Sequence, residues 1–360
     1  MKLFSGTNSR SGIALVVVMV AIFVLSFMAF VFCYSMKVET KLAVNGNADE
    51  QLLWLGRSGV EKARWILAQE TGIAGQPYTA LNQFWNTGVP GPAETNSVLA
   101  GETLDNCKLG DGSFSLKFID LDRYANINTA NTPELQQALT LMGVDADSIS
   151  VVSDSILDWV QPGDAPRIAG AKSDYYQSLD PPYYCKDAPM DDLSELLLVK
   201  GVTPAMYYGG TDSNAPPSPF HHQLGFAVGP GQSPDYPFGL KDLFTALSSG
   251  RININTANTN VLQLIPGVDS AAAAAIVQQR SGPDGDETGQ TATPFQNVGQ
   301  LTTAGVSPQV VQAAGQLCTV RSSVFEVQVT AQLGGNQRTY IAILLVNSPT
   351  DVRVLSFYWK

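Results

Sequence analysis

Residues 11–34 read SGIALVVVMVAIFVLSFMAFVFCY, and this stretch decides how the rest of the 360-residue chain is organised. From Ile13 to Tyr34 there are 22 residues without a charge, flanked by Arg10 and Lys37. At a rise of about 1.5 Å per residue, a helix of this length crosses the roughly 30 Å hydrocarbon core of a bilayer. The stretch therefore predicts one transmembrane helix over 13–34.

The polar leader before this helix ends at Gly12. A secretory signal has a shorter apolar core and a small-x-small cleavage site, which residues 32–36, FCYSM, do not offer. The leader instead resembles a prepilin leader. That resemblance implies that prepilin peptidase cuts between Gly12 and Ile13 and that Ile13 becomes N-methylated. A plain signal anchor of a bitopic protein is the alternative.

The fifth residue after that cleavage site is Val17, where most pilins have glutamate. A carboxylate is costly in lipid without a partner, and in pilin filaments it is thought to pair with the neighbouring subunit's N-terminus. A subunit without it resembles a K-type minor pseudopilin of the type II secretion system, which is placed at the filament tip. Val17 is therefore a candidate assembly residue.

Charge and cysteine content place the rest of the chain. The basic leader and the large remainder predict a cytoplasmic N-terminus, a single pass through the inner membrane and a periplasmic bulk. A formal net charge of −11 argues against non-specific nucleic-acid binding. Disulfides persist in the periplasm. Cys107 and Cys318 each precede a strand-like run and form the pairing we expect, with Cys185 in a Pro/Tyr-rich loop.

The strand-forming sequence is split in two. Residues 35–70 continue the helix with apolar residues at helical spacing, and Gly46 is a weak point in it. Residues 113–122 alternate apolar and polar side chains, as a half-buried strand does. The next comparable runs, 324–331 and 339–345, lie about 200 residues later and flank a Gly-Gly-Asn hairpin signal; 352–359 makes a last strand.

An internal repeat occupies the region between these strands. The heptapeptide NINTANT occurs at 126–132 and again at 253–259. Four Gly-Val turns begin at Gly143, Gly201, Gly267 and Gly305, each followed by Asp, Thr or Ser. Each glycine is expected to end one helix and each third residue to cap the next, giving helical hairpins. The core residues we expect in them are Leu135, Leu139, Leu141, Leu262, Leu264, Ile265, Ala274, Ile276 and Val277.

Helix-hairpin-helix units often bind DNA, and the second copy resembles the competence-type DNA-binding module. Phosphate binding needs nearby lysine or arginine. Residues 263–279 contain neither, and Asp269 lies at the turn. A membrane-anchored DNA-binding protein of the competence type is therefore an alternative with unsuitable charges.

The ordered set of motifs resembles the K-type pseudopilin over nearly the whole chain. The most specific parts are DLDRYANINTA at 120–130, DSILDWVQPGD at 154–164, the GA and YY within 170–176, and the helix start at 192–196 followed by VKGV. The implied fold is α+β: a long N-terminal helix on a small antiparallel sheet, with an all-helical domain inserted between strands. The implied divisions are 1–12 (leader), 13–34 (transmembrane), 35–70 (amphipathic helix), 71–125 (loop and first strands), 126–320 (helical insert with repeats at 126–160 and 253–315) and 321–360 (last strands).

The resemblance also implies a calcium site on the loop bracketed by Asp158, Asp164 and Asp174. Hard cations prefer clustered carboxylate and carbonyl oxygens. Gln161 and Lys172 stand where the family usually has acids. A second acidic cluster, at 284–287, is equally well explained as a solvated turn.

Catalytic motifs are absent from the sequence. His221 and His222 are the only histidines and lie in a Pro-rich stretch, which favours a surface loop. We expect a non-enzymatic subunit that caps the tip of the type II secretion pseudopilus. Its implied partners are the I-type and J-type minor pseudopilins, prepilin peptidase and the inner-membrane secretion platform. A minor pilin of a type IV pilus is the alternative with the same fold.

Overall fold

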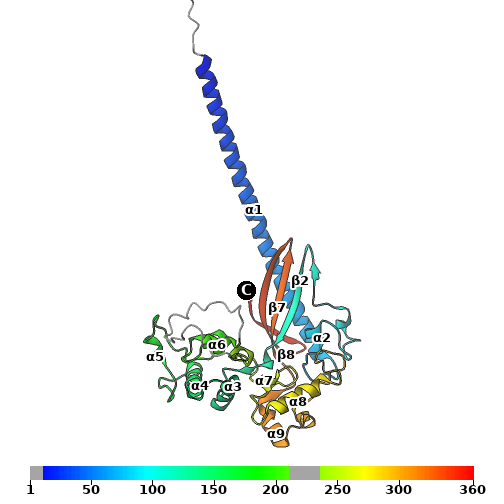
Figure 1. Ribbon diagram of the computed structural model, residues 1–360. Coiled ribbons are helices and arrows are strands. Elements are labelled where there is room, and N and C mark those ends of the chain that lie inside the picture. The colour runs from blue at the N-terminus through cyan, green and yellow to red at the C-terminus, as the bar shows by residue number, and fades with distance from the viewer. Residues whose placement is uncertain (1–10, 211–235) are drawn as a thin grey trace, which may run out of the picture.

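The computed structural model describes residues 11–210 and 236–360 (Figure 1). Helix α1 (Ser11–Gly72) is continuous over 62 residues and passes through Gly46 without a break. Its first half contains a candidate membrane span, Ile13–Leu42, none of which is buried. The long apolar helix predicted from residues 11–34 is confirmed.

The second half of α1 packs on a five-stranded antiparallel sheet of order β1-β2-β7-β8-β9. The strands are β1 (Cys107–Leu109), β2 (Gly112–Asp120), β7 (Val324–Leu333), β8 (Asn336–Ser348) and β9 (Asp351–Trp359). The hairpin signal is confirmed, because Gly334 and Gly335 both have positive φ and connect the pair Leu333–Asn336. The split sheet is confirmed too, since Asp120 lies opposite Phe325 in the ladder between β2 and β7.

Residues between α1 and the sheet cover one end of this core. The elements there are α2 (Phe84–Thr87) and η1 (Val98–Gly101). Trp85 is buried and meets the ring of Phe325 edge to face, with centroids 5.4 Å apart. This segment, expected to be a loop, therefore contributes to the core beneath α1.

Residues between β2 and β7 form a second hydrophobic core of their own. In Figure 1 they lie at the end of the sheet opposite the bare half of α1. Their elements are η2 (Leu121–Arg123), β3 (Ala125–Asn126), α3 (Thr132–Met142), α4 (Ala146–Val160), α5 (Ser173–Gln177), η3 (Leu193–Leu198), α6 (Pro204–Tyr208), η4 (Leu240–Asp242), β4 (Phe244–Thr245), β5 (Ile252–Asn253), α7 (Thr259–Leu262), α8 (Ser270–Ser281), η5 (Val298–Ala304), α9 (Pro308–Leu317) and β6 (Cys318–Thr319).

The expectation of an all-helical insert is wrong in one respect. Two short parallel strand pairs, β3 with β4 and β5 with β6, join segments far apart in the sequence. Each pair has only two residues per strand, which is too short to give a periodic sequence signal.

The four Gly-Val turns behave as predicted at the helix starts. All four glycines have φ between 82° and 84°. The third residue of each turn is the N-cap of the next helix: Asp145, Thr203, Asp269 and Ser307. Of the expected core residues, Ala274 is exposed and its neighbour Ala273 is buried instead. Because α8 contains five consecutive alanines, the sequence does not indicate which of them are buried.

The predicted disulfide between Cys107 and Cys318 is wrong, because both thiols are free. Cys107 lies opposite Phe114, which in turn faces Ala331 near the end of β7. Cys318 comes before β7 begins at Val324. Cys107 belongs to the core between α1 and the sheet, whereas Cys318 belongs to the core of the insert. A disulfide needs Cα atoms within about 7 Å.

Candidate functional site

The two NINTANT copies use their first and last asparagines in the same way. Asn126 and Asn253 each end a two-residue strand, and each side-chain oxygen accepts the backbone N–H two residues later, at 2.9 Å. Asn131 and Asn258 cap α3 and α7 by accepting the N–H three residues later. Repeated sequence thus builds one strand-turn-helix unit twice.

The middle asparagine of each copy fastens that unit to a distant part of the insert. Asn128 accepts the N–H of Met190 at 2.7 Å and donates to its carbonyl at 3.0 Å. Asn255 makes the same pair with Phe295, at 2.8 and 2.9 Å. The amide side chain therefore pairs as a backbone group does, which explains why asparagine recurs there.

The second copy also ties the insert to the sheet, through a buried polar junction where the chain leaves β2. Asp120 accepts hydrogen bonds from the side chains of Thr256 and Ser322, and from Asn253 at 3.4 Å. Asn253 donates in addition to the carbonyl of Thr79, in the segment after α1. Burial, and then the neighbouring Asp122, raises the pKa of Asp120 to about 6.

Asp122 completes the junction from the neighbouring position. Its two oxygens accept the backbone N–H groups of Ser249 and Ser323, both at 2.6 Å. These bonds hold the point where the chain returns to β7. The first half of the DLDRYANINTA motif is therefore the attachment of the insert, a role that sequence reasoning missed because its partners lie 127–202 residues away.

The other candidate surface is α1. The side chain of Val17 is 61% exposed in the apolar half, which has no partner within the described chain. The exposed indole of Trp54, with Arg57 5.1 Å from its ring, and the half-exposed Trp65 lie on the side of α1 away from the sheet. The described residues thus leave these side chains of α1 uncovered. Cleavage between Gly12 and Ile13 stays a prediction.

The predicted calcium ligands are not brought together. Asp158 is buried at the end of α4, but its carboxylate is taken by Arg167, which donates through Nη1 at 2.7 Å and its backbone N–H at 3.0 Å. Asp164 and Asp174 are exposed on the following loop and on α5. Within residues 11–210 and 236–360, no group of three or more acidic, histidine or cysteine side chains is placed to hold a metal.

The second acidic cluster forms bonds within its own turn. Asp286 accepts from Thr288, and Asp284 from Thr291. Glu287 pairs with the buried Arg280 at 3.0 Å. Asp284 and Asp286 are exposed, so this arrangement fits the prediction of a solvated acidic turn.

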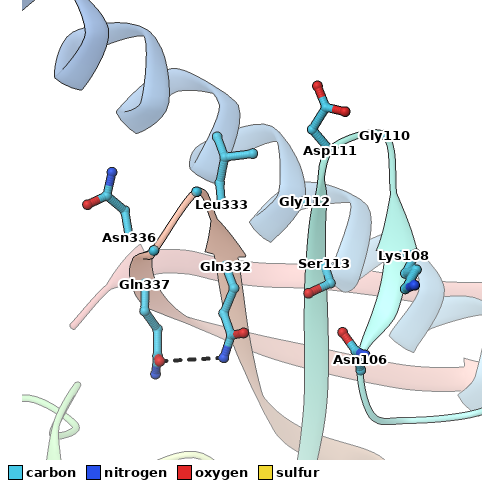
Figure 2. Close-up of a pocket in the computed structure, with 12 residues that line it drawn as sticks. Asn106, Lys108, Gly110, Asp111, Gly112, Ser113, Gln332, Leu333, Asn336 and Gln337 are labelled. Carbon is cyan, nitrogen blue, oxygen red and sulfur yellow. Dashed lines mark hydrogen bonds between the residues drawn. The ribbon is translucent and has the colours of Figure 1, made fainter.

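A polar hollow of about 500 Å³ lies between the two hairpin tips that face the bare half of α1 (Figure 2). Its charged side chains are Lys108 and Asp111, and Gln332 and Gln337 are hydrogen-bonded across its edge. His221 and His222 lie outside the described residues.

A long helix, bare in its first half and packed on an antiparallel sheet in its second, defines a pilin-like subunit. Residues 113–209 match the family model described as type II secretion system (T2SS), protein K. A chain in the crystal structure of the GspK–GspI–GspJ complex from enterotoxigenic Escherichia coli has a similar fold, with a TM-score of 0.63 and 17% identity. The match covers 88% of this chain and 98% of that chain. A search of curated proteins finds no match.

These findings confirm the resemblance drawn from the motifs. Residues 113–209 therefore match the type II secretion protein K family model, and the described chain has a GspK-like fold.

Proposed function

We propose that this chain is the minor pseudopilin that caps the pseudopilus of a type II secretion system. It would be anchored once in the inner membrane with its bulk in the periplasm, and would act as a structural subunit in protein export. The relative of similar fold was crystallised as a GspK–GspI–GspJ complex. We infer the corresponding I-type and J-type subunits as partners here, with prepilin peptidase and the inner-membrane platform acting earlier.

The observation that carries the cap assignment is the position of the insert. It extends from the end of the sheet opposite the membrane-spanning half of α1 (Figure 1). A subunit added beyond this one would have to pack its helix where the insert lies. The buried junction at Asp120 and Asp122 attaches the insert to the sheet, so the obstruction does not depend on a flexible tether.

Val17 supports the same position. A subunit added above would bring its N-terminal amine into the apolar helix bundle, and Val17 offers no carboxylate to pair with it. An unpaired charge in such surroundings costs on the order of a few kcal/mol. Subunits below this one would pair their own residues with the N-terminal amine of the subunit above them, so their addition does not depend on Val17.

We further infer that α3–α4 and α7–α8 are helix-hairpin-helix-like units used as scaffold. The turn between α7 and α8 carries Asp269, whose side chain is already used to cap α8. The one arginine of α8, Arg280, is buried and donates to the carbonyl of Ile254 and to Glu287. No basic side chain of this pair is therefore presented to phosphate, which disfavours the competence-type alternative.

Co-purification tests the proposal most simply. Full-length chain co-expressed with the I-type and J-type subunits of the same organism should elute from detergent as an equimolar complex, and retain no labelled DNA duplex at about 0.15 M salt. A chain that elutes alone, or that retains duplex, would contradict the pseudopilin assignment. Complex formation with type IV pilus subunits instead would favour the minor-pilin alternative.

A further inference from the structure

The loop on which the resemblance implied calcium is already held by cations that belong to the chain. Lys172 is 7% exposed, and its ammonium reaches the end of α4. It donates to the carbonyl oxygens of Asp158 at 2.6 Å and Gln161 at 2.7 Å, and to the carboxylate of Asp187. An ammonium has three donors, and this site supplies three acceptors.

Arg167 neutralises the remaining negative charge at the same place. It occupies both oxygens of the Asp158 carboxylate, and its Nη2 donates to the Gln161 side chain at 2.6 Å. Two cations therefore face two carboxylates, those of Asp158 and Asp187. Each of these two carboxylates therefore already has a cationic partner from the chain.

Backbone packing closes the same loop from the other side. A Cβ at Gly170 would overlap the carboxylate of Asp158, so the chain passes directly against it. Lys200 donates to the carbonyls of Ala169 and Gly170 at 3.3 and 3.2 Å. Three basic side chains thus fix the loop between α4 and α5.

Calcium does not fit this arrangement. It takes six to eight oxygen ligands at 2.3–2.6 Å. To gain the oxygens that lie here it would have to expel the Lys172 ammonium and compete with Arg167. We propose that Lys172 is the permanent cation of this loop, and that the loop folds and stays closed independently of calcium.

Trypsin cleavage after Arg167 gives a local readout, because Ile168 on the other side of that bond is fully exposed. We would measure its rate, together with the melting temperature, for the full-length chain in detergent with chelator or with millimolar calcium. Wild type should give the same values in both. Lys172→Met should be cut roughly tenfold faster or more and melt roughly 5 °C lower in both. Lys117→Met, at an exposed lysine of β2, is the matched control and should behave as wild type.

The position itself is tested by Lys172→Asp, which exchanges the ammonium for one more oxygen ligand. This variant should resemble Lys172→Met in chelator, and calcium should slow its cleavage back toward the wild-type rate. A saturable slowing of wild-type cleavage by calcium would overturn the proposal. So would a Lys172→Met rate equal to that of Lys117→Met, or a Lys172→Asp variant that calcium does not restore.

Discussion

Gly56 and Gly59 set the distance between α1 and the sheet. A Cβ at Gly59 would overlap Val329 and crowd Phe114, and one at Gly56 would overlap the ring of Tyr340. Glycine is otherwise unfavourable in a helix interior by roughly 0.5–1 kcal/mol relative to alanine. The close approach explains why the two glycines stand in this turn of the helix.

Gly59→Ala should therefore lower stability, by about 1–3 kcal/mol, because the sheet must move or Val329 must leave its rotamer. Gly46→Ala in the same helix is the matched control, since nothing lies within 4 Å of the added Cβ. It should raise stability by up to about 1 kcal/mol through helix propensity alone. Melting of the two full-length variants measures the difference; equal effects of the same sign would contradict this packing.

Glu70 and Glu94 form a second buried polar pair, beneath α2, that sequence reasoning did not find. They are 5% and 0% exposed. One oxygen of Glu70 accepts the N–H of Trp85, and one of Glu94 accepts those of Phe84 and Gly91. The other oxygen of each has no partner in the described structure, so one shared proton would satisfy both. Burial, and then the charge of Glu94, raises the pKa of Glu70 to about 9.

The sign of the resulting pH dependence follows from this raised pKa. The folded state holds a proton on Glu70 that the unfolded chain has released. The contribution of this proton to the free energy of unfolding is therefore complete below the ordinary pKa of 4.5, and it is lost progressively as pH rises to about 9. Glu70→Gln carries a permanent donor toward Glu94 and lacks this dependence. Between pH 5 and pH 9, the free energy of unfolding of wild type should decrease relative to that of the variant by up to about 1.4 kcal/mol per pH unit.

Melting at several pH values across that range checks the difference. Glu50→Gln, at an exposed position of α1, is the control and should run parallel to wild type. Parallel curves for Glu70→Gln and wild type would contradict a shared proton.

Among the elements, those with long periodic patterns or strong turn signals were predictable. The uncharged run gave α1, the Gly-Gly-Asn signal gave the β7–β8 hairpin, and the Gly-Val turns gave four helix starts. The two-residue strands could not be predicted, because a parallel pair such as β3 and β4 joins segments more than 100 residues apart. The disulfide prediction failed for a related reason: order along the chain did not reveal that Cys107 and Cys318 lie in different hydrophobic cores. Lys172 was recognised as a departure, but only the structure shows its ammonium meeting three oxygens.

Processing of α1 is the prediction that belongs to that helix. With prepilin peptidase present, mature protein should begin at Ile13 and carry a methyl group. Gly12→Val should block the cut, whereas Gly6→Val in the same leader should not. N-terminal sequencing and mass spectrometry measure both; a start near residue 35, or an intact Met1 in the wild type, would contradict a prepilin leader.

At the scale of the complete subunit, the proposed cap function rests on two features. The insert has its own core and is attached through the buried Asp120 junction, beyond the end of the sheet (Figure 1). Val17 leaves the helix without a carboxylate for a subunit above. Val17→Glu should relieve only the second restriction, so it should permit little entry into the shaft while the insert is present.

Removal of the insert tests the first restriction. Asp120 and Phe325 face each other in the β2–β7 ladder, so a short glycine-containing turn can replace residues 121–323. This variant combined with Val17→Glu should enter the shaft. The folded state of its sheet must be established by melting before filaments are scored.

Immunogold labelling of the wild-type chain, in cells that overproduce the major pseudopilin, tests the cap assignment most directly. If the insert obstructs addition beyond this subunit, as the proposed cap function requires, label should lie at one end of each filament and none along its length. Label scattered along the shafts would contradict the cap.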